Sequence, residues 1–229
     1  MTKQSYVVCT IKSWNIAAFR RRTPALPGEW HLIETPENLT PAFLKNTAPR
    51  YVFFPHWSWR VSTSVLKSYE CICFHMTDVP YGRGGSPLQN LIIRNHKSTM
   101  LTALRMVEEL DAGPVYLKRP LLLDGRAEEI FERAADLGYD MIEEIVTNEP
   151  TPVEQVGDPM MFARRTPDES VLPQAGALVA LYDFIRMLDA PTYPKAFLEW
   201  GEWRLEFDRA GYKGETVEAR VVIRKNKLK

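Results

Sequence analysis

The amino-acid sequence predicts an α/β protein: a mostly parallel sheet with helices on both faces, followed by a small C-terminal helix and antiparallel strands. Three observations predict this fold class. Short, nearly continuous apolar runs alternate with helical or loop segments through the first half of the chain, as in parallel sheets covered on both faces. A long amphipathic segment follows, and the last quarter alternates like antiparallel strands. With 229 residues, 45% of them hydrophobic, the chain is long enough to bury a full core.

Four segments of the first half are predicted as buried strands, because each is a short apolar run rich in β-branched, aromatic or cysteine residues. They are residues 5–11, 30–34, 50–55 and 70–75. Before the third strand, Thr40 and Pro41 supply an N-cap and a first-turn proline for a short helix over 42–46. This alternation predicts crossover connections between parallel strands.

The middle of the chain is predicted to be mainly helical. Pro87 begins one helix. The apolar run 100–110 reads as helical, and an Asp-Ala-Gly turn and a short strand over 113–117 follow it. Asp124 caps a long helix that reaches about Thr147, with apolar residues at helical spacing.

The C-terminal part begins with a stretch, 150–173, that is rich in proline and lacks periodicity, so we predict an extended connection. Residues 175–188 read as an amphipathic helix, and 203–207 and 217–223 as strands of a small antiparallel sheet. Three segments are therefore expected: a catalytic domain over 1–150, a connector over 151–174, and a helix-and-hairpin subdomain over 175–229.

Composition argues against several classes of partner. The 29 basic and 29 acidic side chains cancel, whereas a protein that grips nucleic acid through its phosphates usually carries a basic excess, so we expect no nucleic-acid partner. No run approaches the roughly 20 apolar residues of a membrane span, and the N-terminus lacks a signal-peptide layout. We therefore expect a cytoplasmic protein with no membrane partner. Cys9, Cys71 and Cys73 lack the spacing of a closed zinc site, so buried, reduced thiols and no metal are expected.

The densest candidate site is the stretch 74–89, FHMTDVPYGRGGSPLQ. His75 closes a predicted strand, and a turn with three glycines and two prolines follows it. Ligands of open α/β sheets bind just outside the carboxyl ends of the strands, and glycine lets a substrate approach the backbone closely. The pattern favours a site over the alternative, an ordinary turn with a surface histidine.

A second candidate is Asp111 in the stretch 108–114, EELDAGP. Its carboxylate faces a cleft in one interpretation and is a turn or helix-capping group in the other. Together, His75 and Asp111 offer an acid or base with an orienting carboxylate, as general acid–base chemistry requires. The pattern alone names no substrate.

These residues resemble the signature of the formyltransferase superfamily. Residues 75–80 and 83–89 are similar to its Asn-x-His-x-Ser-Leu-Leu-Pro and Arg-Gly-x-x-Pro-Ile-Gln motifs, and 110–114 is similar to its Leu-Asp-x-Gly segment. Two later patches, 164–170 and 185–197, resemble the family's connector and its Tyr-Pro-Gly-Ala-Phe turn. The resemblance includes the methionyl-tRNA formyltransferases. It is greatest to sugar N-formyltransferases of bacterial pseudaminic acid pathways, for which FPHWSW and RGGSPLQN look characteristic.

The resemblance implies a Rossmann-like catalytic domain, 10-formyltetrahydrofolate as the formyl donor and an amine as the acceptor. It implies that His75 donates to the oxygen of a tetrahedral intermediate, while Asp111 orients His75 and helps to move the proton from the amine to the leaving folate nitrogen. The implied folate contacts are His56, Trp57, Trp59, Val61, Leu110, Ala112 and Gly113. The implied acceptor contacts are Gly84, Gly85, Ser86, Gln89, Asn90, Arg186 and Tyr193. Two alternatives stay open: the tryptophans belong to the core instead, and Arg186 is a surface helix residue.

One departure from the family pattern concerns the oxygen that becomes negative. The family's asparagine falls on Cys73 here, and a thiol is a poor substitute as a hydrogen-bond donor. Either His75 and a backbone N–H hold the oxygen, or the amide of Asn90 reaches in.

The acceptor expected from the sequence is a nucleotide-linked amino sugar. Methionyl-tRNA formyltransferases resemble the core but add a larger C-terminal barrel, and the 32 residues after Phe197 are too few for one. The zero net charge favours a small acceptor as well. The alternatives are a formyltransferase acting on a peptide or aminoacyl amine and a folate-binding protein without catalysis. Because superfamily members often pair, a homodimer is a further expectation.

Overall fold

The computed structural model describes residues 3–226. The chain divides into two compact units. The first comprises Met1–Gly84, Met100–Leu121 and Glu132–Met161, and the second comprises Gly85–Thr99, Leu122–Phe131 and Phe162–Lys229. Because the chain passes between the units several times, they do not coincide with the three consecutive segments expected from the sequence.

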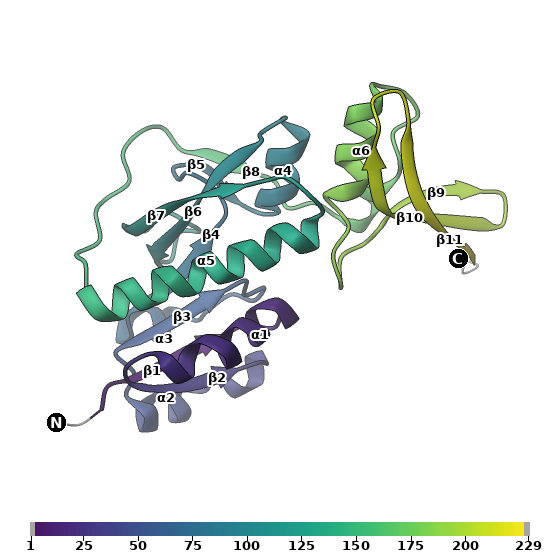
Figure 1. Ribbon diagram of the computed structural model, residues 1–229. Helices are drawn as coiled ribbons and strands as arrows, with labels where there is room; N and C mark the ends of the chain where they lie inside the picture. The colour runs from purple at the N-terminus through teal and green to yellow at the C-terminus, as the bar shows by residue number, and fades with distance from the viewer. Residues whose placement is uncertain (1–2, 227–229) are drawn as a thin grey trace. The chain divides into compact units, whose positions relative to one another are not determined.

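A six-stranded sheet with the strand order β2-β1-β3-β4-β6-β7 forms the centre of the first unit (Figure 1). Its strands are β1 (Ser5–Cys9), β2 (Glu29–Ile33), β3 (Tyr51–Pro55), β4 (Cys71–His75), β6 (Ser98–Arg105) and β7 (Val115–Leu122). The first four strands pair in parallel, and β6 pairs antiparallel to β4. The predicted fold class is confirmed, and so are the four predicted strands, with small shifts at their ends.

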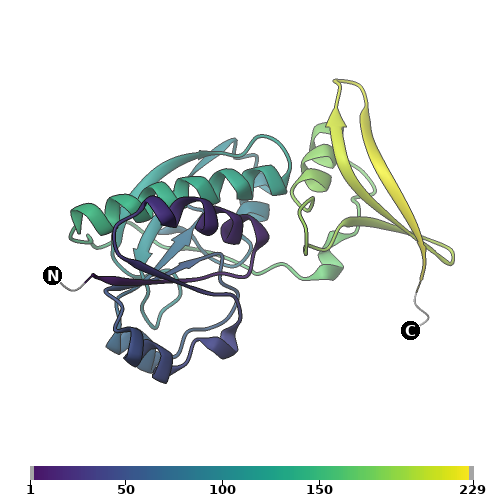
Figure 2. The same ribbon diagram turned by 60° about the horizontal axis from the view of Figure 1, so that its bottom comes forward.

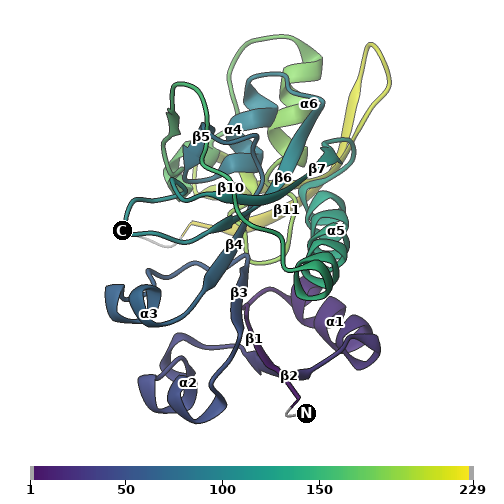
Figure 3. The same ribbon diagram turned by 90° about the vertical axis from the view of Figure 1, so that its left-hand side faces the viewer.

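Helices cover both faces of this sheet, as predicted. Figure 3 shows α1 (Ser13–Arg22) and α5 (Ala127–Asn148) on one side, and α2 (Pro41–Thr47) and α3 (Thr63–Ser68) on the other. α2 begins where expected, because the Thr40 hydroxyl accepts a hydrogen bond from the backbone N–H three residues on, at 3.1 Å. α1 and α3 were missed, since both are short and neither shows a clear apolar stripe. None of the helices in the described part of the chain is long and apolar enough to span a membrane.

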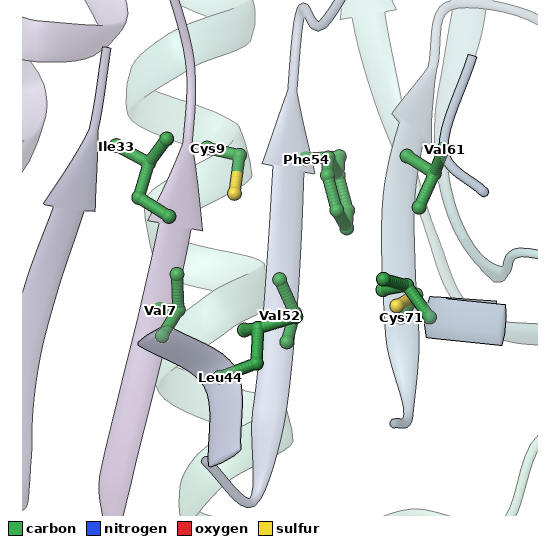
Figure 4. Packing of buried hydrophobic residues seen from close by; sticks show 9 residues of the cluster. Val7, Cys9, Ile33, Leu44, Val52, Phe54, Val61 and Cys71 are labelled. Atoms are coloured by element: carbon green, nitrogen blue, oxygen red, sulfur yellow. The ribbon is translucent and has the colours of Figure 1, made fainter. Parts of the chain in front are cut away.

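One face of the sheet carries the cluster of buried side chains drawn in Figure 4. Its members are Val7, Cys9, Ile33, Leu44, Val52, Phe54, Val61, Val65 and Cys71. Residues two apart on a strand point to the same face, so Val7 and Cys9 of β1 and Val52 and Phe54 of β3 lie in one cluster with Leu44 of α2. Because α1 and α5 cover the opposite face, these strands are apolar on both sides. This explains the nearly continuous apolar runs in the sequence.

The second unit contains α4 (Pro87–Ile93), α6 (Leu178–Arg186) and a three-stranded antiparallel sheet in the order β11-β10-β9. Its strands are β9 (Ala196–Trp200), β10 (Trp203–Tyr212) and β11 (Val217–Lys225). Figure 2 shows α6 lying along the β10–β11 hairpin, where Tyr182 stacks on Tyr212 with ring centroids 6.0 Å apart. The two helices and two of the strands were predicted, and β9 was not.

The prediction of a helix over 100–110 was wrong, because most of this run forms strand β6. Its apolar side chains are buried on both faces of the strand. A strand of this kind has no alternation of period two, so periodicity alone cannot distinguish it from a buried helix.

Two short strands that were not predicted form a separate small sheet. β5 (Tyr81–Gly84) pairs with β8 (Met160–Phe162), which lies in the segment expected to be an extended connection. β5 follows His75 closely along the chain, and its backbone holds much of the candidate site.

Candidate active site

His75 lies at the carboxyl end of β4 and is 7% exposed. Its Nε2 atom lies 2.8 Å from the carbonyl oxygen of Gly82, to which it donates a hydrogen bond. Its Nδ1 atom lies 3.5 Å from Oδ2 of Asp111. Both ring nitrogens therefore face fixed protein oxygens, and the protein sets the orientation of the imidazole. The structure thus brings together the two residues that the sequence singled out from separate motifs.

Asp111 occupies the turn between β6 and β7 with a left-handed backbone (φ 54°), a conformation that aspartate tolerates better than most residues. Its Oδ2 atom accepts a hydrogen bond from the Gly84 N–H at 2.9 Å, and its side chain is 10% exposed. The residue makes the turn, as one interpretation held, and its carboxylate faces His75.

The rest of this turn includes three residues expected to contact folate. Leu110 is 61% exposed, Ala112 is half-buried and Gly113 is buried. A Cβ atom on Gly113 would lie 1.9 Å from the carbonyl oxygen of Arg105. The close approach of two backbone segments therefore requires glycine at this position, independently of any ligand.

Cys73 lies on β4 two residues before His75, so both side chains point to the same face of the strand. Burial, together with the nearby Asp111 carboxylate, raises the pKa of the Cys73 thiol well above its usual range. The thiol therefore stays protonated around neutral pH, where it is a weak S–H donor and not a nucleophile.

Four residues expected at the folate follow β3. Val61 is 6% exposed and belongs to the core cluster. Trp57 packs edge-on against Phe54 of that cluster, with ring centroids 6.0 Å apart. Trp59, in contrast, is 45% exposed and contacts Trp57 at 5.1 Å. Trp57 therefore packs on the core, as one alternative held, whereas Trp59 presents its ring to solvent.

The fourth of these residues, His56, has a left-handed backbone (φ 58°) and meets Trp14 at 5.4 Å between ring centroids. Burial of the ring, together with the positive charge of Lys12, lowers the pKa of His56 to about 3 from the usual 6.5. The ring is therefore neutral at physiological pH.

The lowered pKa of His56 makes the fold sensitive to acid. In the unfolded chain the imidazole takes up a proton near pH 6.5, whereas the folded protein resists this until about pH 3. Its contribution to stability is therefore present above pH 6.5 and is lost as the pH falls towards 3. Asparagine also tolerates the left-handed backbone at this position. As the pH falls from 6.5 towards 3, the free energy of unfolding measured by urea titration is therefore expected to decrease less for His56→Asn than for the wild type. His31→Asn is the control, and equal acid losses in His56→Asn and wild type would contradict the prediction.

Three of the expected acceptor contacts lie in α4 or just before it, within the second unit. A Cβ atom on Gly85 would lie 2.4 Å from Arg164, and the Ser86 hydroxyl accepts from the Arg165 N–H at 3.1 Å. Gln89 is buried, and its Nε2 atom donates to the Met187 carbonyl at 3.0 Å. These contacts give the residues roles in the fold that the motif did not indicate.

Asn90 was one of two candidates to replace the family's asparagine, and its contacts argue against that role. Its Nδ2 atom donates to the carbonyl oxygens of Gly85, Ser86 and Ala163 at 3.0–3.1 Å. Its Oδ1 atom accepts from Arg94 at 2.9 Å. The amide is thus engaged within the second unit, so the expectation that it reaches a developing oxyanion is not supported.

Arg186 is neither the phosphate ligand nor the surface residue that the sequence offered as alternatives. It is 3% exposed, and its Nε atom lies 2.6 Å from Oδ1 of Asp183. Its Nη1 atom donates to the carbonyls of Leu123 at 2.6 Å and Gly125 at 2.7 Å. Tyr193 stacks on Phe131 with centroids 5.2 Å apart. Arg186 in particular is therefore a structural residue, with its donors directed at protein oxygens.

The group of residues around His75, in the first unit, is suited to moving protons. It holds a buried imidazole, a carboxylate against it and a protonated thiol on the same strand face, which are groups used in general acid–base catalysis. Within residues 3–226 no group of three histidine, cysteine, aspartate or glutamate side chains is placed to hold a metal ion. One polar residue of this region, Gln155, was missed because a single glutamine in a proline-rich connector carries no sequence signal.

The chain is similar to several known proteins. A family model described as the methionyl-tRNA formyltransferase C-terminal domain matches residues 167–224. The methionyl-tRNA formyltransferase of Rickettsia massiliae is 31% identical over 107 residues, which make up 45% of this chain and 35% of that relative. This chain spans about a third to a half of the length of the curated relatives it matches.

Solved structures extend the likeness. Methionyl-tRNA formyltransferase from Clostridium thermocellum is 40% identical with a TM-score of 0.95, and the match covers 97% of this chain and 100% of that one. HypX from Aquifex aeolicus, solved in complex with tetrahydrofolic acid, is 17% identical with a TM-score of 0.73, over 90% of this chain and 37% of HypX. A Mycobacterium tuberculosis protein described as a likely sugar N-formyltransferase is 15% identical with a TM-score of 0.71, and a sugar N-formyltransferase from a Shewanella species is 14% identical with a TM-score of 0.65. At these low identities, HypX and the sugar enzymes share the fold alone.

These matches overturn two expectations drawn from the sequence: a nucleotide-linked amino sugar as the acceptor, and no nucleic-acid partner. The family model and the relative matched over its whole length are methionyl-tRNA formyltransferases. This chain covers all of the Clostridium thermocellum chain. The small number of residues after Phe197 is therefore no argument against similarity to methionyl-tRNA formyltransferases. Net charge misled as well, since a sum of charges does not say where basic side chains gather. The expected special closeness to sugar N-formyltransferases receives no support.

Proposed function

The chain belongs to the formyltransferase family that includes the methionyl-tRNA formyltransferases, and on that premise we propose that it transfers a formyl group from 10-formyltetrahydrofolate to the α-amino group of methionyl-tRNA. The observation that supports methionyl-tRNA as the acceptor is the match, at 40% identity, to the whole of the Clostridium thermocellum methionyl-tRNA formyltransferase chain. The donor is the reduced folate that the family uses. The buried pair of His75 and Asp111 supports the chemistry.

In the proposed reaction the amine nitrogen attacks the formyl carbon, a C–N bond forms, and the formyl oxygen becomes negative. The bond to the folate nitrogen then breaks, and the proton that the amine loses ends on that nitrogen. We assign His75 as the hydrogen-bond donor to the negative oxygen, with its Nε2–H exchanging the Gly82 carbonyl for that oxygen when the substrates are bound. Asp111 orients His75 and relays the proton, and the 3.5 Å distance between Nδ1 of His75 and Oδ2 of Asp111 supports this division of roles.

Two of the expected folate contacts fit the proposal best. Trp59 and Leu110 are exposed apolar side chains, 45% and 61% accessible, and a flat aromatic ligand would bury part of that surface. Val61 and Gly113 are accounted for by the core and by the close approach of two backbone segments. We assign Cys73, with its raised pKa, as a protonated neighbour of the reacting groups.

The proposed function is tested by measuring release of tetrahydrofolate from 10-formyltetrahydrofolate in the presence of methionyl-tRNA. Uncharged tRNA and the methyl ester of methionine are the controls, because they separate recognition of the nucleic acid from recognition of the aminoacyl group. Release that depends on methionyl-tRNA supports the proposal. Folate binding without release in any of the three mixtures would point to a folate-binding protein without catalysis.

A further inference from the structure

Gln155, in the segment between α5 and β8, forms hydrogen bonds to the turn that contains Asp111. Its Nε2 atom donates to the carbonyl oxygen of Asp111 at 2.8 Å and to that of Gly113 at 2.7 Å. A single side-chain amide therefore satisfies two carbonyl groups of the same turn. Since the backbone of Asp111 is left-handed (φ 54°), the turn depends on such contacts to keep a conformation that is sparsely populated by itself.

Arg83 fixes the orientation of the Gln155 amide. Its Nε and Nη2 atoms donate to Oε1 of Gln155 at 3.1 and 2.9 Å, and Arg83 is 9% exposed. Arginine has donors only, so Oε1 must face it and the amide nitrogen must face the turn. The Nη1 atom of Arg83 also meets Glu109 at 3.2 Å, so the start of the same turn is held as well.

Strand β5 thus connects both members of the candidate acid–base pair through three consecutive residues. The Gly82 carbonyl accepts from His75, Arg83 orients the Gln155 amide that holds the Asp111 backbone, and the Gly84 N–H binds the Asp111 carboxylate. The backbone and the carboxylate of Asp111 are therefore located by separate contacts from one short strand.

We propose that Gln155 is a positioning residue for the formyl transfer proposed above: it holds the turn so that the Asp111 carboxylate stays against His75. The proposal rests on that function, because Gln155 acts through Asp111 and touches no reacting group. Of the residues that carry it, His75 and Asp111 were singled out for chemistry from the sequence motifs, whereas Gln155 was not.

The test compares Gln155→Leu, which keeps a similar volume but removes the amide, with the wild type in formyl transfer. We expect kcat to fall about 10- to 100-fold, because a displacement of about 1 Å in a catalytic group costs up to about 100-fold. The KM for 10-formyltetrahydrofolate should rise as well, since the turn that Gln155 holds also contains Leu110, an assigned folate contact. Gln174→Leu, the same substitution at an exposed glutamine of the second unit, is the matched control and should leave kcat unchanged.

A double-mutant cycle separates positioning from a general loss of structure. If Gln155 acts through Asp111, adding Gln155→Leu to Asp111→Asn should lower kcat by less than about twofold further, because the two changes remove one shared contribution. An equal loss in both backgrounds, or an unchanged kcat in the single variant, would overturn the proposal.

A measurement that does not depend on enzymatic turnover distinguishes failure of this proposal from failure of the proposed function. Hydrogen–deuterium exchange should become faster over residues 109–113 in Gln155→Leu and stay at the wild-type rate in Gln174→Leu. Faster exchange in a protein that does not formylate methionyl-tRNA would leave the positioning contact standing and count against the acceptor. Unchanged exchange would overturn the role of Gln155 whatever the activity.

Discussion

Replacing Asp111 by asparagine is expected to lower kcat for formyl transfer by about 10²–10⁴-fold, the usual contribution of a positioned acid or base. Asparagine tolerates the left-handed backbone at this position (φ 54°), and its amide oxygen can still accept the hydrogen bond that Gly84 donates at 2.9 Å. What the variant loses is the negative charge opposite Nδ1 of His75 and a group able to take a proton. Single-turnover rates with saturating folate measure the loss of the chemical step itself.

Asp136→Asn is the matched control, because Asp136 is an exposed carboxylate on α5 that pairs with Arg21. It should keep the wild-type rate. Thermal unfolding of Asp111→Asn should stay close to that of the wild type, so that a lower rate reports chemistry and not unfolding. An Asp111→Asn variant with an undiminished single-turnover rate would remove Asp111 from the mechanism and leave it as a turn residue.

Replacing Arg186 by methionine is expected to lower the free energy of unfolding by about 3–5 kcal/mol, as when one partner of a buried ion pair is removed. The substitution leaves Asp183, which is 5% exposed, with Lys97 at 3.5 Å as its remaining ionic contact within residues 3–226. It also removes the donor for the carbonyls of Leu123 and Gly125. Urea unfolding at neutral pH measures the loss, and the KM for the acceptor should be unchanged in protein that remains folded.

Two further variants sharpen the test of Arg186. Arg209→Met changes an exposed arginine and should alter stability by less than about 0.5 kcal/mol. Adding Asp183→Asn to Arg186→Met should recover part of the lost stability, because it removes the uncompensated charge. If Arg186→Met keeps its stability but binds the acceptor more weakly, the phosphate-binding interpretation of Arg186 would be restored and the structural one contradicted.

The sequence was a good guide to the sheet and to the two residues, His75 and Asp111, that the fold brings together. Strands β1 to β4 were predictable because a strand covered on both faces must be apolar throughout, and their runs are short and rich in β-branched and aromatic residues. His75 and Asp111 were predictable because they stand next to turn residues at the ends of strands, where functional groups of open α/β sheets gather.

The parts that sequence could not supply depend on long-range contacts. β5, with the sequence YGRG, has little strand propensity and is a strand because β8 pairs with it. Gln155 and Arg186 are polar side chains whose roles follow from carbonyl groups far away in the chain. No local pattern distinguishes such residues from polar side chains in solvent. The acceptor was misjudged for a related reason. Chain length and net charge do not show which side chains gather on the surface that binds it.

Formyl transfer at the His75–Asp111 pair is tested most directly by identifying the product formed from 10-formyltetrahydrofolate and methionyl-tRNA. After hydrolysis of the aminoacyl ester, mass spectrometry distinguishes N-formylmethionine from methionine. We expect N-formylmethionine to appear with the wild type, in amounts equal to the tetrahydrofolate released, and to fall about 10²–10⁴-fold in rate with Asp111→Asn. Tetrahydrofolate release without N-formylmethionine would contradict the proposed acceptor, and equal rates in the two proteins would contradict the proposed site.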